Sequence, residues 1–172
     1  MANERLYREN ITFLLAEPEA FADRENPKVA ELNATNGLVF NITCALWEDD
    51  TEFTLGDPDT DEGLTFCSSA GEQTPTFDQP TVVFSALRDK DRTANGVFNG
   101  AFERLAFPDG EYIAILRVGK DSDVAFAVND RLKMVAVKTD NPVDLVGNGD
   151  NARIQQNFLQ NGWVNWNRTV TA

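Results

Sequence analysis

The sequence predicts a mainly β protein with one packed helix, and two patterns carry this prediction. Apolar and polar residues alternate with a period of two along several segments, as in half-buried strands. Only residues 93–106 form a long segment whose apolar side chains instead recur every three or four positions. The 172 residues, 42% of them apolar, suffice for one packed domain and not comfortably for two. We therefore expect a single domain over residues 1–172.

The strand predictions rest on alternation and on turn residues. In residues 38–47, Leu38, Phe40 and Ile42 share one face, and Cys44 and Leu46 continue it. Residues 111–118 are apolar on both faces, which favours a central strand. The segments expected as strands are 11–15, 38–47, 81–87, 111–118, 124–128 and 131–139, the last two separated by a turn at residues 129–130.

A further hairpin is expected near the C-terminus. Asn161-Gly162 separates residues 153–160 from residues 163–171, and Asn-Gly is a strong hairpin signal because both turn positions need a positive φ. Ile154 and Phe158 also stand at helical spacing, so a helix remains an alternative for residues 153–160.

Two helices are predicted, a short one and a longer one. Residues 27–34 begin with Pro27, whose missing N–H has no cost in a first helical turn. In residues 93–106, Val97, Phe98, Ala101, Phe102 and Leu105 form one apolar stripe. Gly96 and Gly100 weaken this helix by about 1 kcal/mol each, so packing must hold it.

A long acidic loop is expected over residues 48–63, which contain eight acidic residues and no basic one. Asp57, Asp59 and Asp61 resemble the start of a calcium-binding loop. The EF-hand pattern, however, requires glycine and glutamate where this chain has Glu62 and Ser68. We therefore interpret the segment as a solvated acidic loop and assign no metal and no cofactor.

The charge excludes several classes of function. Lys and Arg total 15 against 28 Asp and Glu, a formal charge of −13. Attraction to nucleic acid or to an anionic membrane surface requires the opposite sign. No apolar run is long enough to span a bilayer, and Met1 to Arg5 lack the apolar stretch of a secretory signal, so we expect an intracellular chain.

The residue types also argue against catalysis. Histidine is absent, which removes the commonest general base and the commonest metal ligand. The carboxylate pairs that stand next to each other all lie in polar runs, where burial cannot raise their pKa. Cys44 and Cys67 are expected as reduced or buried thiols, and the sequence leaves a bond between them open. We expect no enzyme and assign no catalytic residue.

The layout resembles the tail tube (major tail) proteins of long-tailed, non-contractile bacteriophages. The resemblance runs through the 27–34 segment, the strand ending at residues 43–46, the acidic loop, the 95–107 helix, the 111–119 strand and the C-terminal residues 169–172. It implies a β-sandwich or barrel of about eight strands with one flanking helix. It further implies a structural virion protein, made in the host cytoplasm, that forms hexameric rings. These rings stack into a tube around a tape-measure protein, end at a terminator and pass DNA without specific binding.

The resemblance also implies where copies meet. By position, the arm at residues 1–7, the loop at residues 49–62 and the tail after Asn167 would bridge rings. The segment 163–171 is rich in Trp, Val and Thr and free of acidic residues, which favours it as a sheet edge for a neighbouring copy. Its two tryptophans are an odd number of residues apart and should face opposite sides, one toward the core and one toward a neighbour. The expected contact residues are Asp49, Asp50, Asp57, Asp59, Asp61, Glu62, Trp163 and Trp166.

Two other classes of function remain open. The tryptophans and the acidic loop also suit a carbohydrate-binding or adhesion β-sandwich, with or without calcium. A carboxylate-dependent glycosidase ranks lower, because no buried acid is apparent. Within the leading class, the sequence does not separate a tube subunit from a terminator or completion protein.

Overall fold

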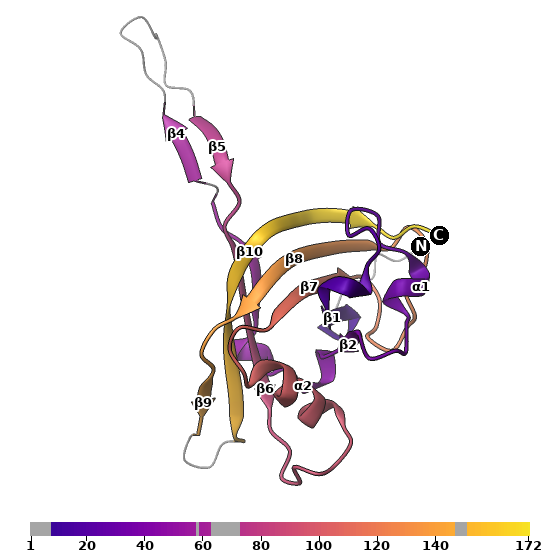
Figure 1. Ribbon diagram of the computed structural model, residues 1–172, viewed down its shortest axis with the longest axis vertical. Helices are drawn as coiled ribbons and strands as arrows, with labels where there is room; N and C mark the ends of the chain where they lie inside the picture. Colours follow the sequence, from indigo (N-terminus) through magenta and orange to yellow (C-terminus); the bar gives the residue numbers. More distant parts are fainter. Residues whose placement is uncertain (1–7, 58, 63–72, 147–150) are drawn as a thin grey trace, which may run out of the picture.

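One bent antiparallel sheet organises the molecule (Figure 1). The computed structural model describes residues 8–57, 59–62, 73–146 and 151–172. Eight strands pair in the order β2-β1-β7-β8-β10-β6-β3, with β9 also on β10, and β4 and β5 form a separate hairpin. The strands are β1 Ile11–Ala16, β2 Val39–Asn41, β3 Glu52–Leu55, β4 Asp59–Glu62, β5 Gln73–Phe77, β6 Pro80–Leu87, β7 Glu111–Val118, β8 Arg131–Thr139, β9 Val143–Leu145 and β10 Arg153–Thr169. The expectation of a mainly β fold is confirmed.

The helical elements are short and lie around this sheet. The α-helices are α1 Val29–Leu32 and α2 Val97–Leu105. The described residues also contain the short 3-10 helices η1 Arg8–Asn10, η2 Pro18–Ala20, η3 Thr43–Ala45 and η4 Glu48–Asp50.

The long strand β10 connects the two halves of the sheet. Its first residues, 153–157, pair with β6, while residues 158–169 pair with β8. The sheet bends so that β1 faces β3 and β6, and the ring of Phe13 lies 5.6 Å from that of Phe84 and 6.2 Å from that of Phe53. The result is a sandwich-like fold whose two layers share β10 (Figure 1).

The two faces of the sheet bury separate apolar clusters. The first lies inside the bend and includes Leu15, Phe84 and Val135, with α2 contributing Ala101 and Leu105. The second lies on the opposite face, under α1 and the loop after β7. Its members include Leu14, Phe21, Leu32, Ile113, Ile115, Phe126, Met134 and Val170. Because β7 is buried on both faces between β1 and β8, its predicted central position is confirmed.

A buried arginine organises the second face. The Arg117 side chain is 1% exposed, and its guanidinium lies 4.1 Å from the centre of the Phe126 ring. It donates to the Thr12 hydroxyl at 3.0 Å and to an Asp130 carboxylate oxygen at 3.3 Å. Its other acceptors are the carbonyls of Asp121, Val124 and Ala125. One buried cation therefore fixes the loop between β7 and β8.

That loop contains the first correction to the predicted strands. Residues 124–128 form no strand, because their backbone groups bond to side chains instead of a ladder. The Asn33 side chain bonds both the N–H and the carbonyl of Phe126, each at 2.9 Å. The turn expected at residues 129–130 is present, with Asn129 at a φ of +72°.

The strand predicted over residues 38–47 is also shorter than expected. β2 ends at Asn41, whose side-chain oxygen accepts hydrogen bonds from the N–H and the hydroxyl of Thr43. This local bonding competes with the strand ladder and turns the chain into η3. Ile42 remains fully buried, whereas Cys44 is an exposed free thiol, so the first of its two expected states, reduced or buried, fits the structure. Cys67 lies outside the described residues.

The predicted C-terminal hairpin is wrong, and so is the helical alternative. Asn161-Gly162 lies inside the continuous strand β10, where the pairing with β8 shifts register between Gln160 and Val164. Gly162 has a φ of +72°, so the Asn-Gly pair provides the positive φ of a β-bulge rather than of a turn.

The predicted acidic loop at residues 48–63 is largely structured. It contains η4, β3 and β4. In β3 only Phe53 is buried, which leaves too few apolar positions for the alternation to stand out among the acidic residues.

The helix predicted over residues 93–106 is confirmed in its core but starts later, at Val97. Gly100 sits where a Cβ atom would lie 2.6 Å from Cζ of Phe40. A Cβ atom at this position would require the Phe40 ring to move, so close packing against β2 favours the glycine that weakens this helix.

Candidate assembly surfaces

An open backbone edge is the first candidate surface. Residues 158–169 of β10 pair with β8 on one side only. Among the described strands, none pairs with their other side, because β6 ends its pairing at Asn157. Unpaired N–H and carbonyl groups on a strand edge can accept a strand of another chain. The predicted edge at residues 163–171 thus overlaps a real edge.

The two predicted tryptophans lie on this strand and face opposite sides. The Trp166 ring stacks on Phe53, with centroids 5.4 Å apart, and packs against the first apolar cluster. The Trp163 ring packs against the second cluster, and its Nε1 donates to Glu25 at 2.6 Å. Both side chains are half-buried within their own chain, and such an arrangement forms no flat sugar-binding platform.

The projecting hairpin of β4 and β5 is the second candidate surface. Figure 1 shows it extending from the body along the long axis of the molecule. Its base is closed by a hydrogen bond of 2.9 Å from the Gly56 N–H to the Gln79 carbonyl. Asp57 is exposed at this base, and Asp59, Asp61 and Glu62 belong to β4. Residues 57–78 contain six acidic residues and no basic one.

Asp49 and Asp50 lie apart from the hairpin, in η4. Asp50 forms an ion pair with Arg153 on β10, and the Arg153 guanidinium lies 5.1 Å from the centre of the Trp47 ring. The structure therefore separates the eight predicted contact residues into three places: η4, the hairpin and β10.

The C-terminal tail is docked on its own chain rather than extended. Val170 is 1% exposed, and the Thr171 N–H donates to the Pro27 carbonyl at 2.9 Å. The N-terminal arm at residues 1–7 lies outside the described residues.

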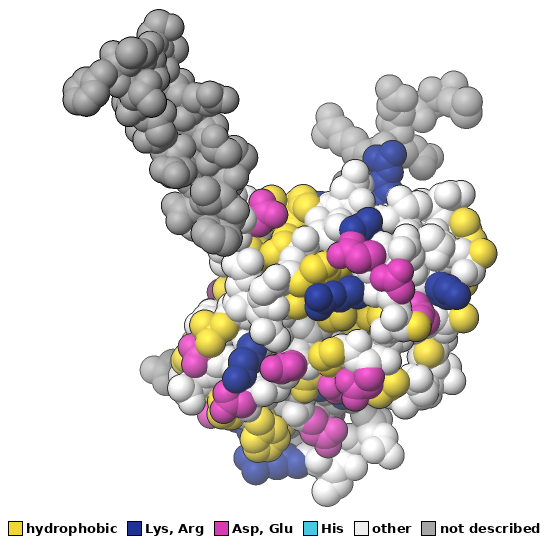
Figure 2. Space-filling model, turned by 45° about the horizontal axis from the view of Figure 1, so that its top comes forward, with side chains coloured by type: hydrophobic (Ala, Val, Ile, Leu, Met, Phe, Trp, Pro, Cys, Tyr) yellow, Lys and Arg dark blue, Asp and Glu magenta, His cyan; other side chains and the backbone are white. Residues whose placement is uncertain are grey.

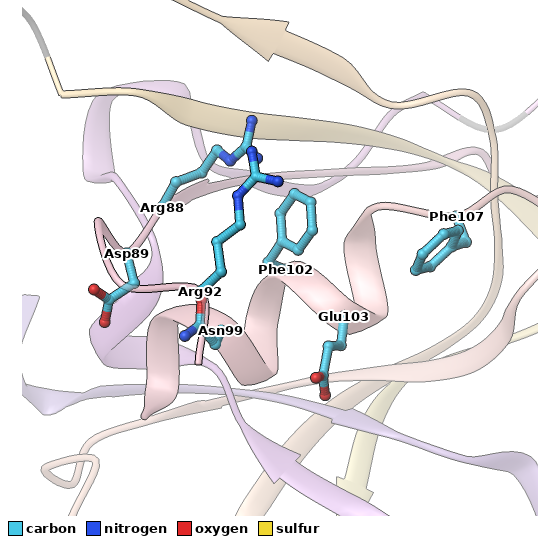
Figure 3. Close-up of a pocket in the computed structure, with 7 residues that line it drawn as sticks. All are labelled: Arg88, Asp89, Arg92, Asn99, Phe102, Glu103 and Phe107. Atoms are coloured by element: carbon cyan, nitrogen blue, oxygen red, sulfur yellow. The ribbon is translucent and has the colours of Figure 1, made fainter. Parts of the chain in front are cut away.

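A pocket that the sequence did not reveal lies between α2 and the loop after β6 (Figure 3). It has a volume of about 190 Å³. The Arg88 guanidinium lies 4.5 Å from the centre of the Phe102 ring and pairs with Asp144 of β9 at 3.0 Å. The remaining lining residues are Asp89, Arg92, Asn99, Glu103 and Phe107. The alternating charges of residues 88–92 were the available signal, but alternation also marks an ordinary solvated turn.

The exposed charges are mixed rather than sorted by sign. Figure 2 shows Lys and Arg side chains interspersed with Asp and Glu over the visible face of the body. Over the described residues, no His, Cys, Asp or Glu side chains gather in groups of three that could hold a metal ion. No helix in that part of the chain is long and apolar enough to cross a membrane.

The bent sheet, its open edge and its projecting hairpin define a β-rich protein with two candidate surfaces for contacts with other chains. Residues 1–172, the whole chain, match the phage tail tube protein family. The chain belongs to this family, which confirms the resemblance. No curated protein matches the sequence. As a member of this family, the protein has a structural role in the tail tube and is a component of the virion tail.

Proposed function

We propose that copies of this chain form hexameric rings that stack into the tail tube, and that DNA passes through the central channel. The observation that carries the proposal is the open edge of β10, because a ring of sheets closes when each subunit pairs its edge with the next. A tape-measure protein inside the growing tube and a terminator at its end are the partners. Assembly follows synthesis in the host cytoplasm.

The charge of the chain supports passage of DNA without binding. Each copy carries a net charge of −13, and like charges disfavour contact between protein and phosphate. Asp49, Asp50, Trp163 and Trp166 are the proposed contacts within a ring, since they lie on or beside β10. Asp57, Asp59, Asp61 and Glu62, at the base of the hairpin and in β4, are the proposed contacts between rings.

The proposal is tested by blocking the open edge. Lysines on an edge strand disfavour pairing with another chain. In Gln160→Lys with Asn167→Lys, both replaced side chains are exposed on the half of β10 that lacks a second partner. We expect a folded monomer by analytical ultracentrifugation, where the wild-type chain gives rings and tubes by negative-stain microscopy.

The matched control carries the same added charge elsewhere. Asn151→Lys with Asn157→Lys changes two exposed residues, one just before β10 and one at the last position of β10 that pairs with β6, and rings should persist. A wild-type chain that stays monomeric at high concentration and at all salt concentrations would overturn the proposal.

A further inference from the structure

One asparagine-glycine pair lies on the open edge of the sheet. Asn161 and Gly162 are exposed and belong to the half of β10 that pairs with β8 only. The pairing with β8 skips residues 161–163, because the register shifts between Gln160 and Val164. Within the described ranges, the Asn161 side chain takes part in no hydrogen bond, so its amide group can turn toward the main chain.

An asparagine followed by glycine can lose ammonia in a reaction with its own backbone. The Gly162 nitrogen bonds to the side-chain carbonyl carbon of Asn161, and the side-chain nitrogen leaves as ammonia with the proton of that N–H. The product is a five-membered succinimide ring, and water opens it at either carbonyl to leave aspartate or isoaspartate. Glycine favours the attack because it has no Cβ atom to crowd the ring.

Two other Asn-Gly pairs are restrained by their surroundings. The Asn99 side-chain nitrogen donates to two backbone carbonyls at 2.8 and 2.7 Å, and the Gly100 N–H donates to the Gly96 carbonyl at 3.0 Å. The Asn36 side-chain oxygen accepts from the Leu38 N–H at 3.0 Å. In both pairs the asparagine side chain would have to give up a hydrogen bond before it could react.

Asn95-Gly96 is the matched pair away from the edge. It lies in the loop between β6 and α2, Asn95 is exposed, and its side chain likewise has no hydrogen bond within the described ranges. The two unrestrained pairs therefore share their chemistry and their exposure and differ in location. Of the four described pairs, only Asn161-Gly162 lies on a strand edge. The fifth pair, Asn148-Gly149, lies outside the described residues.

We propose that Asn161 is a site of spontaneous deamidation, and that the reaction inactivates subunits that have not yet assembled. Either product adds a negative charge to the open edge. Isoaspartate also carries the main chain through its Cβ atom, which displaces the N–H and carbonyl groups that a neighbouring strand would meet. Pairing of this edge in a ring would in turn hold the Gly162 backbone in place and slow the attack. The effect on assembly rests on the proposed function, whereas the reaction itself does not.

The two unrestrained pairs can be compared within one sample. Wild-type protein is incubated at mildly alkaline pH, and tubes are then separated from free subunits by sedimentation. Tandem mass spectrometry of the tryptic peptides 93–104 and 154–168 locates each converted residue. In free subunits both Asn95 and Asn161 should convert. In tubes, conversion at Asn161 relative to Asn95 should fall by about tenfold or more, because the attack then requires local opening of a paired edge.

Two variants link the reaction to assembly. Asn161→Ser removes the reacting amide from an exposed position and should keep the circular dichroism spectrum and the ability to assemble of the fresh wild type. After incubation of free subunits, the wild type should lose assembly in proportion to conversion at Asn161, and Asn161→Ser should retain it. The matched control, Asn95→Ser, should lose assembly as the wild type does.

The failures of the two proposals are distinguishable. Free subunits in which Asn95 converts and Asn161 does not would overturn the modification site. Equal conversion at Asn161 in tubes and in free subunits, or equal loss of assembly in incubated Asn161→Ser, would overturn its effect on assembly. Wild-type chain that never forms rings or tubes would overturn the proposed function and this effect together, whereas conversion at Asn161 in that chain would still support the modification site.

Discussion

At the scale of single residues, Arg117 determines how the loop after β7 packs on the sheet. Its guanidinium is enclosed by a hydroxyl, an aspartate, three carbonyls and an aromatic ring, all on the second face of the sheet. A charged side chain buried near the end of a central strand interrupts the strand's apolar pattern. Here the burial is stable because the cation has partners on β1 and along the loop after β7.

Replacing this arginine should destabilise the fold. Arg117→Met keeps the length of the apolar stem but leaves the Thr12 hydroxyl and the loop carbonyls without this donor. It also removes one of the three groups that donate to the Asp130 carboxylate, of which Lys120 and the Ala127 N–H remain. Breaking one side of a buried pair costs about 3 kcal/mol, so the free energy of unfolding in urea should fall by that amount. Arg131→Met, on an exposed side chain of β8, is the control and should change it by less than about 0.5 kcal/mol. Equal stability of both variants would contradict this assignment.

The partner carboxylate makes stability depend on pH. Burial raises the pKa of Asp130, but hydrogen bonds from Lys120, the Ala127 N–H and Arg117 outweigh it, and the net pKa lies below the ordinary 3.8. A lowered pKa in the folded state contributes stability above that ordinary value, and this stability is lost as the pH falls through the folded pKa.

Asp130→Asn should therefore reduce stability most near neutral pH. The difference in unfolding free energy from the wild type should shrink as the pH falls below about 4. Urea unfolding of both chains from pH 7 to pH 3 measures it, with Asp123→Asn as a control for removing one exposed carboxylate from the same loop. A difference that stays constant over this range would contradict the role of the lowered pKa.

At the scale of elements, regular alternation was predictable and local side-chain bonding was not. The strands at residues 11–15, 81–87, 111–118 and 131–139 followed from their pattern, because burial on one or two faces determines it. The 38–47 segment failed because Asn41 and Thr43 bond locally, and the 124–128 segment failed because Asn33 bonds its backbone. Such bonds depend on single side chains, and they leave the alternation of apolar residues intact.

Of the candidate surfaces, too, only a part could be predicted from the sequence. The edge at residues 163–171 was predictable in part, since β-branched and aromatic residues without acidic neighbours favour a strand. The bulge at the preceding Asn161-Gly162 pair was not predictable, because a bulge and a turn both use a positive φ. The pocket lined by Arg88 and Arg92 depends on how the loop after β6 packs on α2. The spacing of residues in the sequence does not predict this packing.

The bulge in β10 gives a direct test at Gly162. A side chain at a φ of +72° strains the backbone, so Gly162→Ala should lower the unfolding free energy by about 1 kcal/mol. Gly162→Asn should cost less, because asparagine tolerates the left-handed region better than alanine. Thermal melting of the three chains checks the order, and alanine as stable as glycine would contradict it.

The contact between α2 and β2 predicts coupling between two positions. Alanine normally stabilises a helix relative to glycine by about 1 kcal/mol, but at Gly100 its Cβ would meet the Phe40 ring at 2.6 Å. We expect Gly100→Ala to destabilise the wild-type chain by about 1 kcal/mol through overpacking. In a Phe40→Leu background the same change should become neutral or stabilising, and a double-mutant cycle measures this. Additive effects would show that the ring moves aside freely.

At the scale of the whole molecule, the hairpin is separable from the body. The β4–β5 hairpin forms its own two-stranded sheet, and Gly56 and Gln79 already meet at its base. Joining these two residues through a short glycine-serine turn should therefore leave a folded protein whose melting temperature lies within about 4 °C of the wild type. The proposed function predicts that this variant forms rings but no tubes. A truncated chain that unfolds would show that the hairpin is part of the body.

The route of β10 also determines when the body can fold. This strand comes last along the chain, yet it supplies the pairing partner for β6, β8 and β9 and joins both layers. During translation, β6, β8 and β9 leave the ribosome before β10, the strand with which they pair, has been made. A partly made chain thus lacks the strand edge on which the proposed rings close, so the proposed assembly has to wait until β10 has been made.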